Sequence, residues 1–413
     1  MSKVLRPIDV SALLVFWLIA GGAPDAQTPK LSELAARAHA AMAEERFDAA
    51  ARLYATLAEA RPREAWLHMN LGTAYAMAGR PQQARAPLER AIELDPSLLG
   101  AQLFLGMVYL DLGQPKRAVD PLRTVLAVEA SNVMARQALG EALVELRRYE
   151  EAATELAQVT RALPESAHAW AALGRSYDGA AQQAAQQASA ALRTGGAQGA
   201  ATTRTDTDRE RSHQRAVAFS HLADEAFRRL EELPASVELH VVKAELYRAR
   251  GGPRDAVREL RAAAKLAPND PAIARDLAAA LYLARNYDEA RPIVERLLKA
   301  DPNDPNRPDL QILYGRILLD TQQVDEALTY LEAAIRAAPA NAEGQAALGR
   351  ALMLKGDARA AVPHLKAALV ADEDGSLHYQ LAQAYRQTGQ PALARSTLET
   401  YKKLQAQARR GIR

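Results

Sequence analysis

Cysteine is absent from this 413-residue sequence. A chain without thiols forms no disulfide, no thiolate metal site and no cysteine nucleophile. An excess of either charge is also lacking, because 52 basic residues stand against 50 acidic ones, which gives a formal net charge of +2. This balance argues against nucleic acid as a partner bound by bulk electrostatic attraction.

Patterns typical of catalytic or metal sites are missing as well. The eight histidines include no His-Glu-x2-His pair, and residues 174–178 lack the final glycine of a Gly-x-Ser-x-Gly nucleophile turn. The acidic stretch 301–309 lacks the central glycine and the final glutamate of a calcium-binding loop. We therefore expect a protein that is not an enzyme and that binds neither a metal nor a cofactor.

What the chain does contain is alanine-rich and helical in character. Hydrophobic residues make up 49% of the chain and charged residues 25%, and alanine dominates the apolar fraction. The stretch 71–96 is nearly repeated 34 residues later. The spacing predicts a first helix over about 65–78, a break at Gly79-Arg80-Pro81 and a second helix that stops at Asp95-Pro96.

Small residues recur between these breaks at a fixed separation. Gly72 and Ala84 are twelve residues apart, and we expect them on facing sides of the two helices, where only small side chains allow close approach. Larger residues such as Tyr75 and Leu88 are expected to fill the space between neighbouring helix pairs. The same separation recurs in Gly106 with Ala118, Gly140 with Ala152, Gly315 with Ala327, and Gly349 with Ala361.

This pattern closely resembles the tetratricopeptide repeat (TPR) family, whose period is 34 residues and whose signature includes Leu-Gly-x2-Tyr. Leu71-Gly72-Thr73-Ala74-Tyr75 and Leu105-Gly106-Met107-Val108-Tyr109 carry the match, as do residues 173–177 and 381–385. The signature positions are Gly72, Tyr75, Ala84, Pro96, Gly106, Tyr109, Ala118, Gly140, Ala152, Gly174, Tyr177, Ala256, Ala290, Gly315, Ala327, Gly349, Ala361 and Ala394. The resemblance implies an all-α, right-handed α-solenoid of about ten helix-turn-helix units.

The units fall into two regular blocks around one irregular unit. Residues 27–166 hold units one to four, residues 237–406 hold units six to ten, and residues 407–413 form a polar cap. Unit five, residues 167–236, carries a low-complexity insertion around 178–215. We expect the insertion to extend a helix at first and then to form a mobile loop over 194–208, with the second helix resuming near Ala216. The alternative is a degenerate eleventh repeat.

Residues 1–26 have the order of a secretory signal peptide. Lys3 and Arg6 precede an apolar run from Val10 to Ala20, and small residues follow. The run is about 11 residues long, shorter than the roughly 20 residues that span a bilayer. We therefore expect export to the periplasm or the medium. The alternative is an inner-membrane anchor over residues 8–23, which would be the chain's only contact with a membrane.

The resemblance further implies that the first helix of each pair lines a concave groove for a peptide or a partner helix. The groove positions of units two to four are Trp66, Met69, Asn70, Thr73, Leu103, Met107, Leu110, Met134, Gln137 and Glu141. These side chains either form an apolar binding groove or are buried between units. In later units Arg275, Arg316, Arg350 and Arg386 form either a basic stripe or local ion pairs, and we favour ion pairs.

Together these features predict a non-catalytic scaffold that binds an unidentified protein or peptide, in the bacterial cell envelope. The alternative is a membrane-tethered adaptor or an accessory subunit of an envelope-polymer or glycosyl-transferring enzyme complex.

Overall fold

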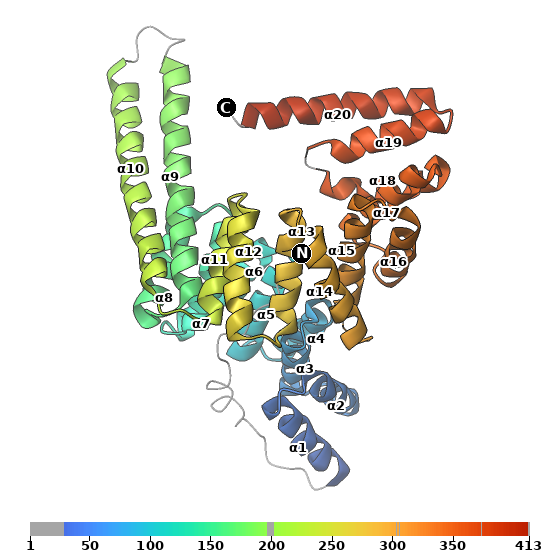
Figure 1. Ribbon diagram of the computed structural model, residues 1–413. Coiled ribbons are helices and arrows are strands. Elements are labelled where there is room, and N and C mark those ends of the chain that lie inside the picture. The colour runs from blue at the N-terminus through green and yellow to red at the C-terminus, as the bar shows by residue number, and fades with distance from the viewer. Residues whose placement is uncertain (1–28, 196–201, 303, 305, 373, 412–413) are drawn as a thin grey trace. The chain divides into compact units, whose positions relative to one another are not determined.

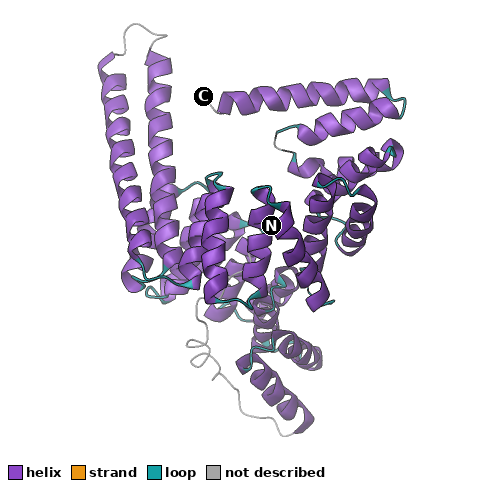
Figure 2. Ribbon diagram, in the orientation of Figure 1, coloured by secondary structure: helices purple, strands orange, loops and turns teal. Residues whose placement is uncertain are grey.

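A computed structural model describes residues 29–195, 202–302, 304, 306–372 and 374–411. Within these residues the regular structure is helical throughout and consists of α1 to α20 and one 3-10 turn (Figures 1 and 2). The chain divides into two compact units between Leu233 and Pro234. The all-α solenoid expected from the sequence is confirmed, because within each unit consecutive helices pack in antiparallel pairs on their neighbours.

The odd-numbered helices are the first helices of their pairs and the even-numbered helices are the second. The first unit contains α1 (Pro29–Ala43), α2 (Phe47–Ala60), α3 (Ala65–Met77), α4 (Pro81–Leu94), α5 (Leu99–Asp111), α6 (Pro115–Val128), α7 (Val133–Glu145), α8 (Tyr149–Ala162), α9 (Ala167–Gly195) and α10 (Thr202–Glu232). The second unit contains α11 (Val237–Ala249), α12 (Pro253–Leu266), α13 (Pro271–Leu283), α14 (Tyr287–Ala300), α15 (Arg307–Asp320), α16 (Val324–Ala337), α17 (Ala342–Lys355), α18 (Ala358–Ala368), the 3-10 turn η2 (Leu369–Ala371), α19 (Ser376–Gln387) and α20 (Pro391–Gly411).

A residue in the left-handed conformation ends the first helix of nine pairs. At Gly79, φ is +70°, and the backbone N–H of Arg80 bonds back to the carbonyl of Tyr75 at 2.9 Å. Glycine occupies this turn at Gly79, Gly113, Gly251, Gly356 and Gly389, whereas Glu45, Arg147, Arg285 and Gln322 occupy it in the other four pairs. The predicted glycine breaks are confirmed, and the four turns without glycine carry the left-handed strain that glycine avoids.

The expected close approach inside each pair is confirmed, although its partner is larger than predicted. A Cβ built on Gly72 would lie 2.5 Å from Cγ of Leu88 and 3.0 Å from the carbonyl oxygen of Ala84. Leu88 is fully buried, so the glycine makes room for a leucine as well as for the backbone at Ala84. The same contact recurs where Gly106 meets Leu122, Gly140 meets Leu156, Gly315 meets Leu331, and Gly349 meets Leu365.

The prediction of a mobile loop over 194–208 is wrong for residues 194–195 and 202–208, which the structure describes as helical. Helix α9 extends through Gly195 and α10 begins at Thr202, so the insertion lengthens both helices of unit five into a hairpin (Figure 1). Residues 196–201 lie outside the described part, and no eleventh repeat forms in the rest. The reason is that Ala181 stands where other units have their left-handed residue, and alanine and glutamine then continue the helix.

The two ends of the chain bear on other predictions. Residues 1–26, the predicted signal peptide or anchor, lie outside the described residues. Helix α20 continues through Gly411, beyond the predicted end of the last unit at 406. None of the described helices combines the length and the apolar character needed to cross a membrane.

Candidate interaction surfaces on the first helices

The ten predicted groove residues lie together on α3, α5 and α7 of the first unit. Five of them are buried, and these are Thr73, Leu103, Met107, Leu110 and Gln137. The other five, Trp66, Met69, Asn70, Met134 and Glu141, are half-buried. Met69 and Met134 pack against the cluster that contains Leu103, Met107 and Leu110. Burial between neighbouring helix pairs therefore accounts for Leu103, Met107 and Leu110. Among the predicted groove residues, only Trp66, Met69 and Met134 leave apolar surface exposed.

Polar contacts hold part of this surface in place. The indole N–H of Trp66 donates to a carboxylate oxygen of Glu64 at 2.6 Å, next to the start of α3. On α7 the amide of Gln137 donates to Glu141 at 3.2 Å, one helical turn away. Trp66 and Glu141 are therefore oriented before any partner arrives, which lowers the entropy that binding would cost.

A contact that the sequence analysis missed ties first helices to the loops before them. The side chain at the fourth position of the helix donates to the backbone carbonyl six residues earlier. His68 bonds to Pro62 at 3.0 Å, Trp170 to Pro164 at 2.8 Å and Gln345 to Pro339 at 2.7 Å, and Arg136 bonds to Ala130 in the same way. Because the residue type at this fourth position varies, no sequence pattern predicts the hydrogen bond. Only the position of the polar hydrogen relative to the preceding loop, which the structure gives, identifies it.

Three of the four arginines singled out in the second unit form ion pairs, as favoured from the sequence. Arg350 on α17 lies 2.8 Å from Asp320, Arg275 on α13 lies 3.7 Å from Asp304, and Arg316 on α15 pairs with Glu343. Each pair joins neighbouring repeats or a repeat and its loop. Arg386, on α19, is exposed and makes no ion pair with any residue in the described ranges.

Asp320 is the centre of a polar cluster on these helices. Its side chain is only 17% exposed, and it accepts hydrogen bonds from the hydroxyls of Tyr282 at 2.9 Å and Tyr287 at 3.3 Å, besides the Arg350 guanidinium. The guanidinium of Arg316 lies over the Tyr282 ring, 4.5 Å from its centroid. Three donors on one half-buried carboxylate fix its orientation.

The pKa shifts of the two tyrosines show which charges surround the cluster. Burial raises the pKa of Tyr282, and the charge of Arg316 opposes that rise. Burial also raises the pKa of Tyr287, Asp320 raises it further, and the charges of Arg285 and Arg350 lower it. Arg285, Arg316 and Arg350 are therefore all close enough to this cluster to act on its hydroxyls.

Two leucines flank the cluster at the same register of the repeat. Asp320 follows Arg316 by one turn on α15, and Leu354 follows Arg350 by one turn on α17. Leu283 ends α13 at the matching position. Leu283 is 51% exposed and Leu354 is 55% exposed, among the largest exposures of any apolar side chain in the described residues. We call Leu283, Arg316, Asp320, Arg350 and Leu354 the inner row.

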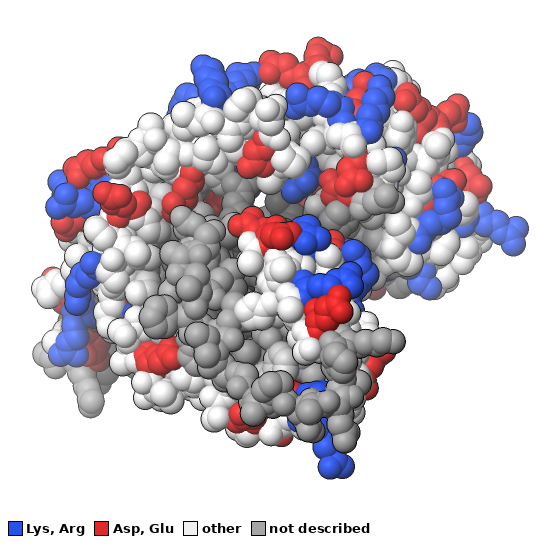
Figure 3. Space-filling model, turned by 90° about the horizontal axis from the view of Figure 1, so that it is seen from below, with Lys and Arg blue, Asp and Glu red and all other residues white. Residues whose placement is uncertain are grey.

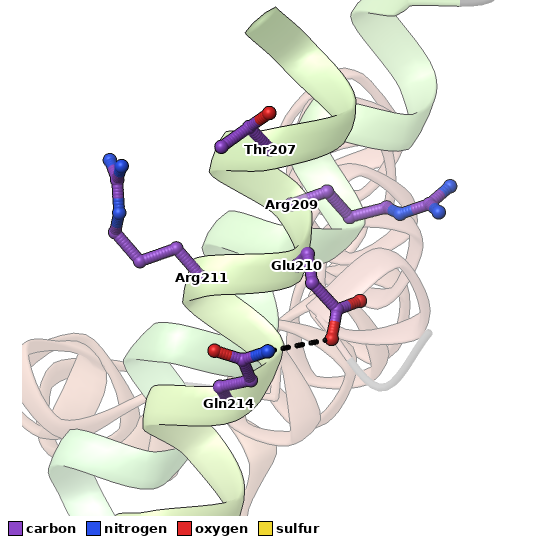
Figure 4. A pocket seen from close by; sticks show the side chains of 5 residues that line it. All are labelled: Thr207, Arg209, Glu210, Arg211 and Gln214. Atoms are coloured by element: carbon purple, nitrogen blue, oxygen red, sulfur yellow. Dashed lines mark hydrogen bonds between the residues drawn. The ribbon is translucent and has the colours of Figure 1, made fainter. Parts of the chain in front are cut away.

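A second surface feature, on α10, does not form a site. A shallow depression is lined by Thr207, Arg209, Glu210, Arg211 and Gln214 (Figure 4). The two arginines point in opposite directions, and the amide of Gln214 donates to Glu210 at 3.0 Å. These side chains do not converge on a common point where a ligand could bind.

Charge elsewhere is mixed in sign. On the face drawn in Figure 3, lysine and arginine are interspersed with aspartate and glutamate over the described residues. No group of three or more histidine or acidic residues in the described ranges could hold a metal ion.

Comparison with known proteins places the repeats in a family. One tetratricopeptide repeat model matches residues 35–98, 241–305, 312–376 and 346–409, and a second tetratricopeptide repeat model matches residues 109–175. The matches leave out residues 176–240, which include most of the α9–α10 hairpin. A search of curated proteins found no match.

Several solved structures are similar to parts of the chain. MamA (residues 41 to the end) from Desulfovibrio magneticus RS-1 is 25% identical, with 41% of this chain and 96% of that chain covered and a TM-score of 0.35. A tetratricopeptide repeat protein from Parabacteroides merdae ATCC 43184 is 14% identical, with 78% and 98% covered and a TM-score of 0.42. YrrB, described as a TPR protein with an unusual peptide-binding site, is 19% identical, with 44% and 92% covered and a TM-score of 0.32.

The family assignment follows from the sequence models and from the stacked helix pairs, since the matches of the first model alone cover more than half of the chain. The chain belongs to the tetratricopeptide repeat family.

Proposed function

We propose that this protein is a non-catalytic scaffold that binds a protein partner through side chains on its first helices. The observation that carries the proposal is the architecture itself. Helix pairs stack so that first and second helices share one continuous core, while side chains near the ends of first helices, such as Leu283, Asp320 and Leu354, keep exposed surface at a constant register. A repeated register presents many weak contacts along one surface, which suits an extended partner.

The proposed place of action is the bacterial cell envelope. Its support is the order of residues 1–26, with Lys3 and Arg6 before a short apolar run. Cell fractionation and N-terminal sequencing of the native protein test this part. A mature protein that starts near Ala23 to Gln27 in the envelope fraction supports it, and a cytoplasmic protein that starts at Met1 or Ser2 contradicts it.

Partner binding is tested with the purified chain immobilised and exposed to an envelope extract of its host. A retained protein is then purified, and its affinity for the chain is measured directly. The test variant carries Trp66→Ser and Met69→Ser, because these half-buried side chains leave apolar surface at the predicted groove positions. Leu103 and Met107 are not substituted, since they are buried and serine there would disturb the fold. The control carries Val128→Ser and Leu266→Ser, which replace exposed residues at the ends of second helices.

Weaker binding of the partner to the variant with Trp66→Ser and Met69→Ser, with the control unchanged, supports the scaffold proposal. Absence of any partner that binds the purified chain directly contradicts it.

A further inference from the structure

The α9–α10 hairpin is fixed at its base to the fourth helix pair. The ring of Tyr149, at the start of α8, lies in a notch at Gly179, where an added Cβ would come within 2.5 Å of Cδ1 of the ring. The side-chain amide of Gln183 donates to the backbone carbonyl of Arg147 at 2.8 Å, and Arg147 is the left-handed residue of the turn before α8. Helix α9 is therefore held to the fourth pair as far as Gln183.

Helix α10 contacts the same pair at the same level of the hairpin. Arg215 forms an ion pair with Glu150 of α8. Beyond Gln183 and Arg215 the two helices continue past α7 and α8 (Figure 1). We call residues 167–183 and 215–232 the base, and residues 184–190 and 207–214 the distal arm.

Large side chains close the seam between the two helices of the base. The rings of Tyr177 and Phe219 are stacked, with centroids 6.3 Å apart. Phe227 fills a notch at Gly174, where an added Cβ would lie 2.6 Å from Cε1 of its ring. Leu230 is fully buried as well. Burial of these aromatic and aliphatic groups stabilises the base.

Alanine closes the seam of the distal arm. Ala184 and Ala188 of α9 are buried, and they are the only buried side chains among residues 184–190 and 207–214. An antiparallel count from the stacked rings of the base places the half-buried Ser212 opposite Ala184. An alanine buries one methyl group, so this seam gains much less from apolar burial than the base does.

Electrostatic contacts do not replace the missing apolar ones. Residues 179–190 contain no charged side chain, so no ion pair crosses the seam within the distal arm. On α10, Arg211 donates to Asp208 at 3.2 Å and Gln214 donates to Glu210 at 3.0 Å, and both bonds stay within one helix (Figure 4). The distal arm therefore depends on helix propensity and on its alanine seam.

Helices with so little shared apolar contact are marginal in water, because ordering each residue costs conformational entropy. We propose that the distal arm opens as a separate two-state element while the base and the repeats stay folded. Opening stops at Gln183 and Arg215, where the contacts with α8 begin. It exposes Ala184 and Ala188, so any molecule that binds only one state shifts the population of the arm. This inference does not depend on the proposed scaffold function.

The absence of cysteine allows a thiol-labelling test on the full chain. Ala188→Cys places a thiol in the distal arm, and Ala181→Cys places one in the base. These alanines are 9% and 8% exposed, so the two positions are matched in the closed state. Each variant is labelled with a neutral maleimide at low urea concentrations. Its rate is divided by its rate in the unfolded chain, which corrects for differences in thiol reactivity.

We expect the thiol at position 188 to react roughly tenfold or more faster than the thiol at position 181, because local opening requires less free energy than opening of the base. Its rate should depend only weakly on urea, since opening the arm exposes little surface. Equal corrected rates, or a urea dependence as steep as that of global unfolding, overturn the proposal.

Hydrogen exchange of the unsubstituted chain shows whether the cysteine itself causes the opening. Backbone amides of the distal arm should exchange roughly tenfold or more faster than those of residues 173–180 and 219–230. Exchange of the distal arm as slow as that of the base overturns the proposal, even if the thiol at position 188 reacts rapidly.

A second pair of variants tests whether the distal seam controls opening. In the Ala188→Cys background, Ser212→Ala makes a half-buried seam position apolar and should slow labelling by about threefold. Ser220→Ala makes the same chemical change at an exposed position of the base on the same helix, and it should leave the rate unchanged. Circular dichroism checks that all variants are folded. Equal effects of the two serine substitutions overturn the proposal, because opening would then not be governed by the distal seam.

Discussion

The contact between a glycine on the first helix and a leucine on the second allows a quantitative test of the packing. In the third pair, a Cβ on Gly106 would lie 2.5 Å from Cγ and 2.7 Å from Cδ2 of Leu122. Real side-chain carbons do not approach so closely, and Leu122 is fully buried with no room to retreat. Gly106→Ala should therefore lower the free energy of unfolding by about 1–3 kcal/mol, although alanine is the better helix former.

A second substitution separates overpacking from other causes. Leu122→Ala removes the atoms that the new methyl group would strike, and by itself it should cost about 2–5 kcal/mol. In that background Gly106→Ala should no longer destabilise the protein, and should stabilise it by about 0.5–1 kcal/mol through its higher helix propensity. The sign of the effect of one methyl group thus reverses, and the two substitutions should couple by about 2 kcal/mol.

The measurement is urea unfolding of the wild type, both single variants and the double variant, followed by circular dichroism. Gly113→Ala is the control, because Gly113 has φ of +66° and no atom within 4 Å of its added carbon. Its cost is backbone strain alone and should not change when Leu122 is replaced. Additive effects for Gly106 and Leu122, or a Gly106→Ala protein as stable as the wild type, would refute the assigned packing.

Three further predictions follow from single side chains. Burial lowers the pKa of His364, while Glu332 opposes this effect, so its neutral form stabilises the fold; unfolding free energy should fall as pH drops below about 6.5, and His364→Gln should remove that part of the fall. Burial raises the pKa of Tyr54 and of Tyr109 to about 12, so both should ionise after most other tyrosines in an absorbance titration, and the stability they contribute below pH 10 should be lost as pH rises through about 12. Gln322→Gly removes left-handed strain at φ +65° and should raise the melting temperature or leave it unchanged; a clear decrease would contradict the strain argument.

The repeat architecture was accessible from sequence because each helix pair depends on contacts within about one period. Gly79 and Pro81 act on their own backbone, and Gly72 needs room for a leucine sixteen residues away. Such contacts recur at constant spacing, so the pattern alone predicted helices, turns and close approaches. The long α9–α10 hairpin was missed for the opposite reason. Its low-complexity composition suggested a loop, although its alanines and glutamines favour helix.

The candidate site depended on information that spacing does not contain. Sequence placed Leu103 and Met107 on the first helices but could not tell how closely those helices pack, and close packing buried both side chains. In the second unit Leu283 and Leu354, which stand nearer the ends of their first helices, remain exposed. Whether a side chain on a first helix stays exposed depends on the side chains of the neighbouring repeats, so the sequence of one repeat does not specify it.

The sequence by itself determined the all-helical repeat, its family and the presence of partnered arginines on the first helices, because these follow from local spacing and from charge that must be compensated nearby. Only the tertiary structure decided that Asp320 collects Tyr282, Tyr287 and Arg350 from three helices. The physical reason is that a hydrogen bond or ion pair depends on distances of a few tenths of an ångström, and those distances are set by how neighbouring helix pairs pack.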